Sequence, residues 1–250
     1  MITIRGVSYE IHGQPILRDI DLDLPRGGVT ALIGPNGAGK STLLSLIARL
    51  KKLQSGRIGV DDLEVGKCSD RDLAKVLAIM PQSGHVSARL RVGELVEMGR
   101  YPWHQGRPGA HDREIVAETL TRFSLDALRD RFLDEISGGQ RQRALAAMAY
   151  AQGTDYLLLD EPLNNLDIAA ARHLMRLLRD MATGGGKTIV IVLHDINYAA
   201  AFADRIVVMH EGRIAADGAP ETIITQDLLT GVFGTDAEIL TLGARPVVMV

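Results

Sequence analysis

A glycine-rich segment between a short apolar run and an amphipathic stretch constrains this chain more than any other feature. It spans Gly34–Thr42 and reads Gly-Pro-Asn-Gly-Ala-Gly-Lys-Ser-Thr. Before it, Val29–Ile33 is apolar and contains β-branched residues, which is typical of a buried strand. After it, Lys40–Leu50 carries apolar residues at helical spacing. The sequence therefore predicts a strand and a helix joined by a tight glycine loop.

The spacing inside this loop is that of a phosphate-binding site. Glycines let backbone N–H groups curl around phosphate oxygens, and the helix N-terminus adds partial positive charge. We expect Lys40 to reach the β- and γ-phosphates of ATP, and the Ser41 hydroxyl to ligate Mg²⁺. A chance match is the alternative, and the predicted strand and helix disfavour it. The candidate ATP-binding residues are Gly34, Pro35, Asn36, Gly37, Ala38, Gly39, Lys40, Ser41 and Thr42.

The rest of the chain alternates between strand-like and helix-like segments. Ile2–Leu24 alternates apolar and polar residues around Gly13–Gln14, which predicts an antiparallel hairpin. Strands and helices that alternate later in the chain predict a mainly parallel α/β sheet. The later strands are expected at Tyr156–Leu159, Thr188–Leu193, Ile206–Met209 and Arg213–Asp217, with a helix at Ile168–Met181.

Between residues 83 and 152 the strand-like runs disappear. Helices are expected at Arg91–Arg100, Asp112–Phe123 and Arg141–Ala151, and Tyr101–Gly109 is expected to be a loop. We therefore expect one domain over residues 1–250. Its core would comprise residues 1–82 and 153–250, and residues 83–152 would form a helical insertion.

Two adjacent acids end one of the apolar strands. Buried strands do not normally end in paired carboxylates without a partner for the charge. We expect Asp160 to join the Mg²⁺ site and Glu161 to orient and deprotonate an attacking water. An exposed acidic turn is the alternative. His194 follows another apolar strand and would lie on the same edge of the sheet, where we expect it to sense the γ-phosphate.

Composition narrows the possible partners. The net charge is −3 and the pI is about 6.2, so no basic footprint for nucleic acid is visible. Cys68 is the only cysteine, which excludes a disulfide within one chain. The sequence shows no signal peptide and no apolar run of the roughly 18–20 residues needed to span a bilayer. At a membrane, partners would have to hold the protein.

A further motif, Ile-Ser-Gly-Gly-Gln at Ile136–Gln140, resembles the signature sequence of the ABC ATPase family. The order of motifs is similar to that family over essentially the whole chain. The resemblance implies a P-loop NTPase core with an N-terminal antiparallel β subdomain and a helical insertion. It also implies that two copies sandwich two ATP molecules head to tail. The signature residues Ser137, Gly138, Gly139 and Gln140 would then contact ATP held by the other copy.

The resemblance assigns further candidates. Gln82 resembles the family's Q-loop glutamine, with a role at Mg²⁺ or the attacking water. Asp167 resembles the aspartate that lies across the dimer interface. The family usually places an aromatic side chain on adenine near the first hairpin. Here Ile11 falls where that aromatic often lies, and Tyr9 is two residues earlier, so Tyr9 or Ile11 is expected to touch the base.

Three other stretches are similar to the importer ATPases for iron–siderophore, haem and cobalamin. They are Met98–Pro102 with Gln105–Arg107, Leu159–Asp167, and Val192–Asn197. This resemblance implies a membrane permease that docks on the helical insertion, with Tyr101 and Trp103 as candidate anchors. It also implies a substrate-binding protein as an indirect partner. The protein would act at the cytoplasmic face of the cell membrane, importing a ferric siderophore or a related iron chelate.

Other members of the same family remain as alternatives. A soluble ABC ATPase that acts on DNA or ribosomes carries the same motifs. DNA-repair members contain long coiled coils and ribosome-acting members usually carry two ATPase domains, whereas this chain has no long heptad run and one phosphate loop. An importer for another substrate, or a separate exporter subunit, is also compatible with the motifs.

Overall fold

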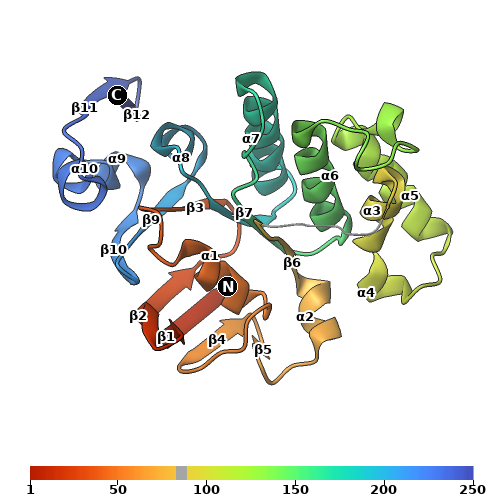
Figure 1. Ribbon diagram of the computed structural model, residues 1–250, viewed down its shortest axis with the longest axis horizontal. Coiled ribbons are helices and arrows are strands. Elements are labelled where there is room, and N and C mark those ends of the chain that lie inside the picture. The colour runs from red at the N-terminus through yellow and green to blue at the C-terminus, as the bar shows by residue number, and fades with distance from the viewer. Residues whose placement is uncertain (83–88, 250) are drawn as a thin grey trace.

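The computed structural model describes residues 1–82 and 89–249. A six-stranded sheet crosses the molecule in the order β10-β9-β3-β8-β7-β6 (Figure 1). The five strands from β9 to β6 are parallel, and β10 is antiparallel to β9. The strands are β3 (Val29–Ile33), β6 (Leu77–Met80), β7 (Tyr156–Asp160), β8 (Thr188–Val192), β9 (Arg205–His210) and β10 (Arg213–Gly218).

Side chains from the three central strands alternate between two hydrophobic cores. In β8, Ile189 and Ile191 belong to the core on one face, and Val190 and Val192 belong to the core on the other. All five residues of β3, β7 and β8 are buried. A parallel sheet covered on both faces has this pattern, which explains why these strands are continuous apolar runs in the sequence.

A second, antiparallel sheet covers one face, in the order β2-β1-β4-β5. Its core is shared with α1 (Lys40–Ile47), which lies between the two sheets (Figure 1). The predicted hairpin is therefore confirmed. The strands of this sheet are β1 (Ile2–Ile11), β2 (Gln14–Leu24), β4 (Arg57–Val60) and β5 (Leu63–Glu64), and α2 (Asp70–Val76) follows them.

Helices cover the opposite face. In Figure 1 the helices α3 (yellow), α5 (yellow-green) and α6 (green) gather at one end of the large sheet, beside α7. From residue 89 to 152 the structure contains helices and no named strand. We propose that they belong to the expected 83–152 insertion, of which residues 83–88 lie outside the described residues. The helices are α3 (Val92–Met98), α4 (Tyr101–His104), α5 (Ala110–Arg122), the short 3₁₀ helix η1 (Asp126–Leu128), α6 (Gly138–Ala151), α7 (Ile168–Thr183) and α8 (Ile196–Phe202).

Some expectations require correction. Tyr101–His104 forms a short helix rather than part of a loop, because Pro102 is compatible with the first turn of a helix. Trp103 and Arg100 hold this helix against the end of α6. The C-terminal residues, for which no element was expected after Asp217, form α9 (Pro220–Ile223), α10 (Gln226–Phe233) and a hairpin of β11 (Glu238–Leu242) and β12 (Arg245–Met249).

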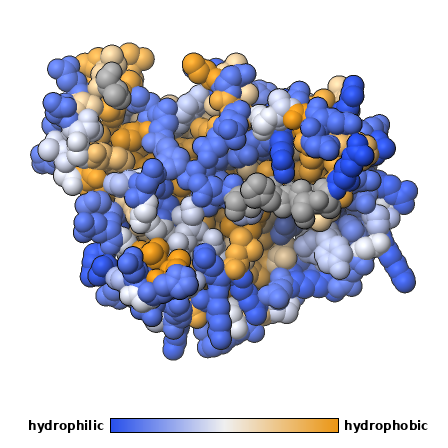
Figure 2. Space-filling view, viewed as in Figure 1, coloured by the Kyte–Doolittle hydropathy of each residue, from blue (hydrophilic) through white to orange (hydrophobic). Residues whose placement is uncertain are grey.

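The C-terminal hairpin stands at the edge of the molecule, beside α8 and α9 (Figure 1). In the space-filling view, hydrophobic side chains gather on the surface near the chain end (Figure 2). Leu240, Leu242 and Met249 are exposed there. Among the described residues, no helix combines the length and the apolar character needed to cross a membrane.

A polar cluster joins the two sheets at the start of β7. The Arg26 guanidinium pairs with the Asp61 carboxylate, and the Tyr156 hydroxyl donates to Asp61 Oδ1 at 2.6 Å. The hydrogen bond from Arg26 holds the pKa of Asp61 well below its usual range. Burial, with the hydrogen bond to Asp61, raises the pKa of Tyr156 to about 12. The cluster therefore depends on an ionised Asp61.

We predict that Asp61→Asn lowers the free energy of unfolding at neutral pH, because Arg26 loses its carboxylate partner. A depressed folded-state pKa contributes stability above the unfolded pKa of about 3.9 and loses it as pH falls toward the folded value. The difference from wild type should therefore be largest above about pH 4 and shrink in stronger acid, measured by urea unfolding across pH. The control is Glu64→Gln, which removes an exposed pair with Lys67. An equal effect of both substitutions would contradict the prediction.

Candidate functional site

The glycine loop lies at the end of β3, with its backbone packed against neighbouring strands. Gly34 has a φ of 145°, and a Cβ added there would lie 2.0 Å from the carbonyl oxygen of Met209 in β9. Gly39, with a φ of 99°, would place a Cβ 2.6 Å from Leu17 of β2. A side chain at either position would push the loop out of this arrangement. The glycines thus hold the loop against the sheet.

Lys40 begins α1 and is buried beneath the loop. Its ammonium donates to the carbonyl oxygens of Gly34 at 2.8 Å and Pro35 at 2.9 Å. Burial lowers the pKa of Lys40, while the charges of Glu161 and Asp160 oppose that shift. A partly desolvated cation held at the mouth of a helix N-terminus is well placed to receive a phosphate.

Asp160 ends β7 beside the start of α1. The Ser41 hydroxyl donates to its Oδ1 at 2.9 Å. Burial raises the pKa of Asp160, although the hydrogen bond from Ser41 acts in the opposite direction. A buried carboxylate of this kind gains from a cation next to it, and a carboxylate with a hydroxyl is a donor set that suits Mg²⁺. The two residues fit the expected metal role.

Glu161 turns the chain sharply after β7, with a φ of 52°. Its Oε1 lies 2.6 Å from Nε2 of His194, and Asn164 Nδ2 donates to its Oε2 at 2.7 Å. Burial by itself would raise the pKa of Glu161, but hydrogen bonds with Asn164, His194 and Gln82 outweigh burial and hold this pKa below its ordinary value. Glu161 is therefore an ionised carboxylate that is ready to accept a hydrogen bond or a proton.

The structure brings part of the glycine loop together with Gln82, Glu161 and His194 around one open cavity of about 830 Å³. The glycine loop forms one side, Gln82, Glu161 and His194 form another, and Ile11 and Ile16 add an apolar wall. Tyr9 does not line this cavity; its ring lies near the Lys51 ammonium instead. The β1–β2 pairing changes register between Tyr9 and Glu10, so Tyr9 and Ile11 have different surroundings.

The residues of Ser137–Gln140 do not line that cavity. They line a separate surface hollow of about 590 Å³, together with Asn165 and Asp167. Ser137 caps α6: its hydroxyl accepts from the N–H of Gln140 at 3.2 Å, and the Gln140 side chain accepts from the N–H of Ser137 at 2.9 Å. Asp167 caps α7 in the same way, accepting from the N–H of Ala170 at 2.7 Å. Two capped helix N-termini therefore share this hollow.

Sequence reasoning missed three residues of the site. Ile16 adds to the apolar wall, Asn164 holds Glu161, and Gln142 donates to the Glu161 carbonyl oxygen at 3.1 Å. Asn164 stands three residues after Glu161, a spacing at which a side chain can return to the turn it follows. Nothing in the sequence indicates that Gln142 of α6 reaches β7, because that contact depends on how the helix packs.

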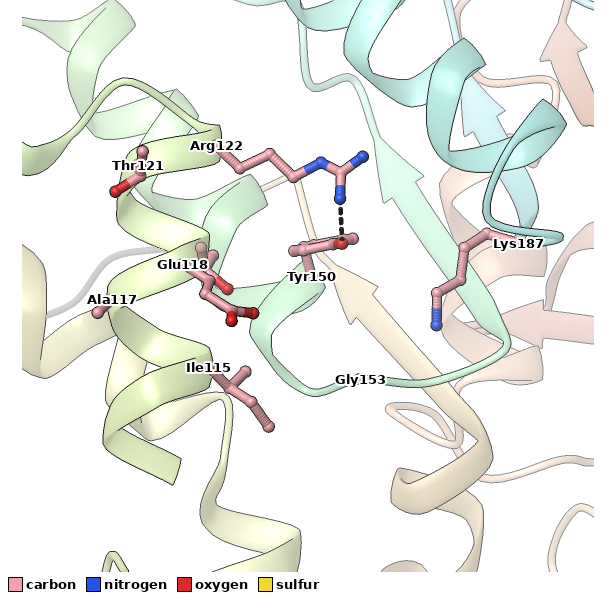
Figure 3. A pocket seen from close by; sticks show the side chains of 9 residues that line it. Ile115, Ala117, Glu118, Thr121, Arg122, Tyr150, Gly153 and Lys187 are labelled. Carbon is pink, nitrogen blue, oxygen red and sulfur yellow. Dashed lines mark hydrogen bonds between the residues drawn. The ribbon is translucent and has the colours of Figure 1, made fainter. Parts of the chain in front are cut away.

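Another hollow, of about 730 Å³, lies between α5 and the start of β8 (Figure 3). Its cations are already engaged: Arg122 donates to the Tyr150 hydroxyl at 3.0 Å, and Lys187 donates to the Thr154 carbonyl oxygen. Figure 3 shows Arg122 directed at Tyr150 and Lys187 on the opposite wall. None of the described residues that line this hollow belongs to a glycine loop at a helix N-terminus, so the cavity at Gly34–Thr42 remains the candidate nucleotide site.

We predict weak discrimination between ATP and GTP, because Ile11 and Ile16 offer an apolar wall without hydrogen-bond donors or acceptors for the base edge. Ile11→Tyr should increase the preference for ATP, since an aromatic ring gives adenine a stacking surface. The measurement is competition of the two nucleotides for a fluorescent ATP analogue. Tyr9→Phe is the control and should leave the ratio unchanged. A marked change in the ratio for Tyr9→Phe, with none for Ile11→Tyr, would move the base contact to Tyr9.

Comparison with known proteins agrees with this geometry. The chain is 47% identical to the petrobactin import ATP-binding protein FatE of Bacillus anthracis. The match extends over 240 residues, 96% of this chain and 96% of that protein. It is 43% identical to the petrobactin import ATP-binding protein YclP of Bacillus subtilis, over 97% of this chain and 96% of that protein.

Solved structures show the same fold. A dimeric ABC transporter cassette, MJ0796, matches with a TM-score of 0.79 and 28% identity over 88% of this chain and 98% of that one. The same cassette has been solved after hydrolysis, with ADP and Pi bound. An inward-facing metal-chelate type ABC transporter matches with a TM-score of 0.83 and 26% identity over 99% of this chain and 95% of that one. The family model for the ABC transporter matches residues 17–164. The chain therefore belongs to the ABC transporter family, of which it is an ATP-binding and ATP-hydrolysing member.

Proposed function

We propose that this protein powers the import of a ferric siderophore or a related iron chelate through a membrane permease. The observation that carries the ATP-driven part is the Glu161–His194 contact, which faces the glycine loop across one cavity. The two relatives described above are named as petrobactin import ATP-binding proteins, and this supports the substrate class. A substrate-binding protein would deliver the chelate to the permease, and the ATPase would act at the cytoplasmic face of the membrane.

The active form is a head-to-tail homodimer. In one chain, Ser137–Gln140 lie in a hollow apart from the nucleotide cavity, although their capped helix N-terminus has the chemistry of a phosphate site. A second copy can bring that N-terminus over the γ-phosphate of an ATP held by the first. Asp167 shares the hollow and would lie at the same interface. The dimeric cassette among the solved structures supports this arrangement.

Several residues in and beside the cavity then have a defined part in hydrolysis. Lys40 and the loop amides neutralise the phosphates, and Ile11 packs against the base. Ser41, Asp160 and Gln82 would hold Mg²⁺, which supplies charge stabilisation for the phosphoryl group when bound. Glu161 orients and deprotonates the attacking water. His194 and the partner copy's Ser137 complete the contacts to the γ-phosphate.

Of the two aromatic residues expected to anchor the permease, only one is suited to that role in the structure. The Trp103 indole N–H donates to the Gln152 carbonyl oxygen at 2.7 Å, and its ring lies between Lys75 and Arg100. Trp103 thus joins α4 to the end of α6. Tyr101 is 61% exposed, more than Trp103 at 40%, and its ring contacts that of His104 edge-on. Tyr101 is therefore the proposed anchor for the permease, and Trp103 has a structural role beneath it.

We predict that Glu161→Gln binds ATP with wild-type affinity but hydrolyses it about 100-fold more slowly or worse, because the amide cannot accept a proton. ATP should then accumulate unhydrolysed in a stable dimer, detected as a doubled mass by light scattering. Glu118→Gln, on the exposed surface of α5, is the matched control and should behave as wild type. Hydrolysis by Glu161→Gln at the wild-type rate would exclude Glu161 as the base.

The transport role predicts loss of iron uptake. Deletion of the gene should abolish accumulation of ⁵⁵Fe supplied as a siderophore complex, and the wild-type copy should restore it while the Glu161→Gln copy should not. An affinity-tagged chain isolated from membranes should carry a permease with it. Co-purification of ribosomes or DNA instead, with iron uptake unchanged by deletion, would refute transport and favour a soluble ATPase.

A further inference from the structure

The C-terminal hairpin is hydrogen-bonded to the start of α8. Asn197, in the first turn of this helix, makes two hydrogen bonds with the backbone of one strand residue. Its Nδ2 donates to the Val248 carbonyl oxygen at 2.9 Å, and its Oδ1 accepts from the Val248 N–H at 2.8 Å. The side-chain amide pairs with both backbone groups of Val248, as a neighbouring strand would. This pairing fixes the position and the orientation of the first turn of α8 relative to β12.

The same hairpin is also hydrogen-bonded to the other end of α8. Arg245, the first residue of β12, donates to the carbonyl oxygens of Ala200 at 2.9 Å and Ala203 at 3.0 Å. The last carbonyl groups of a helix lack partners within the helix and carry partial negative charge, so a guanidinium stabilises them. The Glu221 carboxylate lies 3.6 Å from the same nitrogen and holds the arginine in place.

The hairpin supplies much of what holds α8 in place. It contains seven residues, and a helix this short is marginal without tertiary contacts. Its fully buried side chains are Ala199 and Ala200, which bury little apolar area. Three larger side chains of the helix pack against the large core but are only partly buried, namely Ile196, Tyr198 and Phe202. Arg179 of α7 also donates to the Phe202 carbonyl oxygen at 3.0 Å. Asp195 caps its first turn, accepting from the N–H of Asn197 at 2.7 Å, and such a cap contributes about 1 kcal/mol. The position of α8 therefore depends on β12 together with this partial packing.

This position matters because His194 stands immediately before the Asp195 cap. On its other side, the N–H of Leu193 donates to the Leu32 carbonyl oxygen at 3.1 Å and ties the chain to β3. The His194 side chain itself is 43% exposed, with Nε2 against Glu161. Because packing covers only part of the ring, its direction depends on the backbone that leads into α8.

We propose that the β11–β12 hairpin positions His194 for hydrolysis, with Asn197 and Arg245 as positioning residues. The inference rests on the role of His194 in the proposed function. The hairpin acts through α8: Asn197 sets the helix start, Arg245 holds the helix end, and together they keep the imidazole within reach of Glu161 and the γ-phosphate. Neither positioning residue lines the nucleotide cavity.

The first experiment separates positioning from binding. Asn197→Ala and Arg245→Ala should each lower kcat for ATP by roughly tenfold, a loss expected when a catalytic group is slightly misplaced, with KM little changed. Arg245→Lys should recover much of the rate, because an ammonium can still donate to a carbonyl oxygen. Leu242→Ser is the matched control on the same hairpin, at a side chain that is 76% exposed. Wild-type kcat in both alanine variants would overturn the proposal.

The second experiment observes His194 directly and does not depend on turnover. In protein labelled with ¹⁵N-histidine, the imidazole signal of His194, assigned by its loss in His194→Ala, should shift or broaden in Asn197→Ala and in Arg245→Ala. It should stay in place in Leu242→Ser. An unchanged signal in both alanine variants would overturn the proposal, even if one of them lost activity through reduced stability.

The outcomes also distinguish the positioning role of the hairpin from the catalytic role proposed for His194. If His194→Ala hydrolyses ATP at the wild-type rate, the assigned role of His194 fails, and the hairpin has no catalytic consequence through it. If His194→Ala is slow while Asn197→Ala and Arg245→Ala match wild type in rate and spectrum, the positioning role alone fails. If His194→Ala and Asn197→Ala are both slow, adding Asn197→Ala to His194→Ala should lower kcat no further.

Discussion

Direct contact between backbone segments holds the phosphate loop in place, and the site depends on that contact. Gly34 lies where a Cβ would overlap the Met209 carbonyl oxygen, and Gly39 packs against β2. The loop therefore presses on β9 of the large sheet and β2 of the antiparallel sheet at once. Because both sheets support the loop, the start of α1 is held in place. Lys40 and Ser41, the first two residues of α1, therefore line the cavity.

The charges in the cavity balance one another across short distances. Burial pushes the pKa of Lys40 down and that of Asp160 up, so each would gain from a bound partner of opposite charge. In the proposed function, a nucleotide with its metal supplies both partners. Glu161 differs, since its hydrogen-bond partners keep its pKa low without a ligand. Lys40 and Asp160 would thus be stabilised by a ligand, whereas Glu161, the proposed base, is held ionised without one.

Three helices place their ends near the residues proposed to contact the γ-phosphate. The N-termini of α6 and α7, capped by Ser137 and Asp167, face one hollow that is separate from the nucleotide cavity. The short helix α8 follows His194 and is held by the C-terminal hairpin at both ends. Under the proposed mechanism, movement of either group of elements would change contacts at the γ-phosphate without altering the phosphate loop.

The sequence by itself determined the parallel sheet, the phosphate loop and the hairpin, because periodicity and glycine spacing are local signals. It also indicated that Glu161 and His194 would meet, since residues that follow parallel strands share one edge of the sheet. Gln82 was assigned to the same site through its resemblance to the family's glutamine. Only the tertiary structure placed Ile11 rather than Tyr9 in the cavity, because a register shift in the β1–β2 pairing separates them. It alone showed Trp103 engaged with Gln152, and Asn197 joined to Val248 fifty-one residues later. Contacts between side chains and distant backbone groups leave no periodic pattern in the sequence, so packing had to decide them.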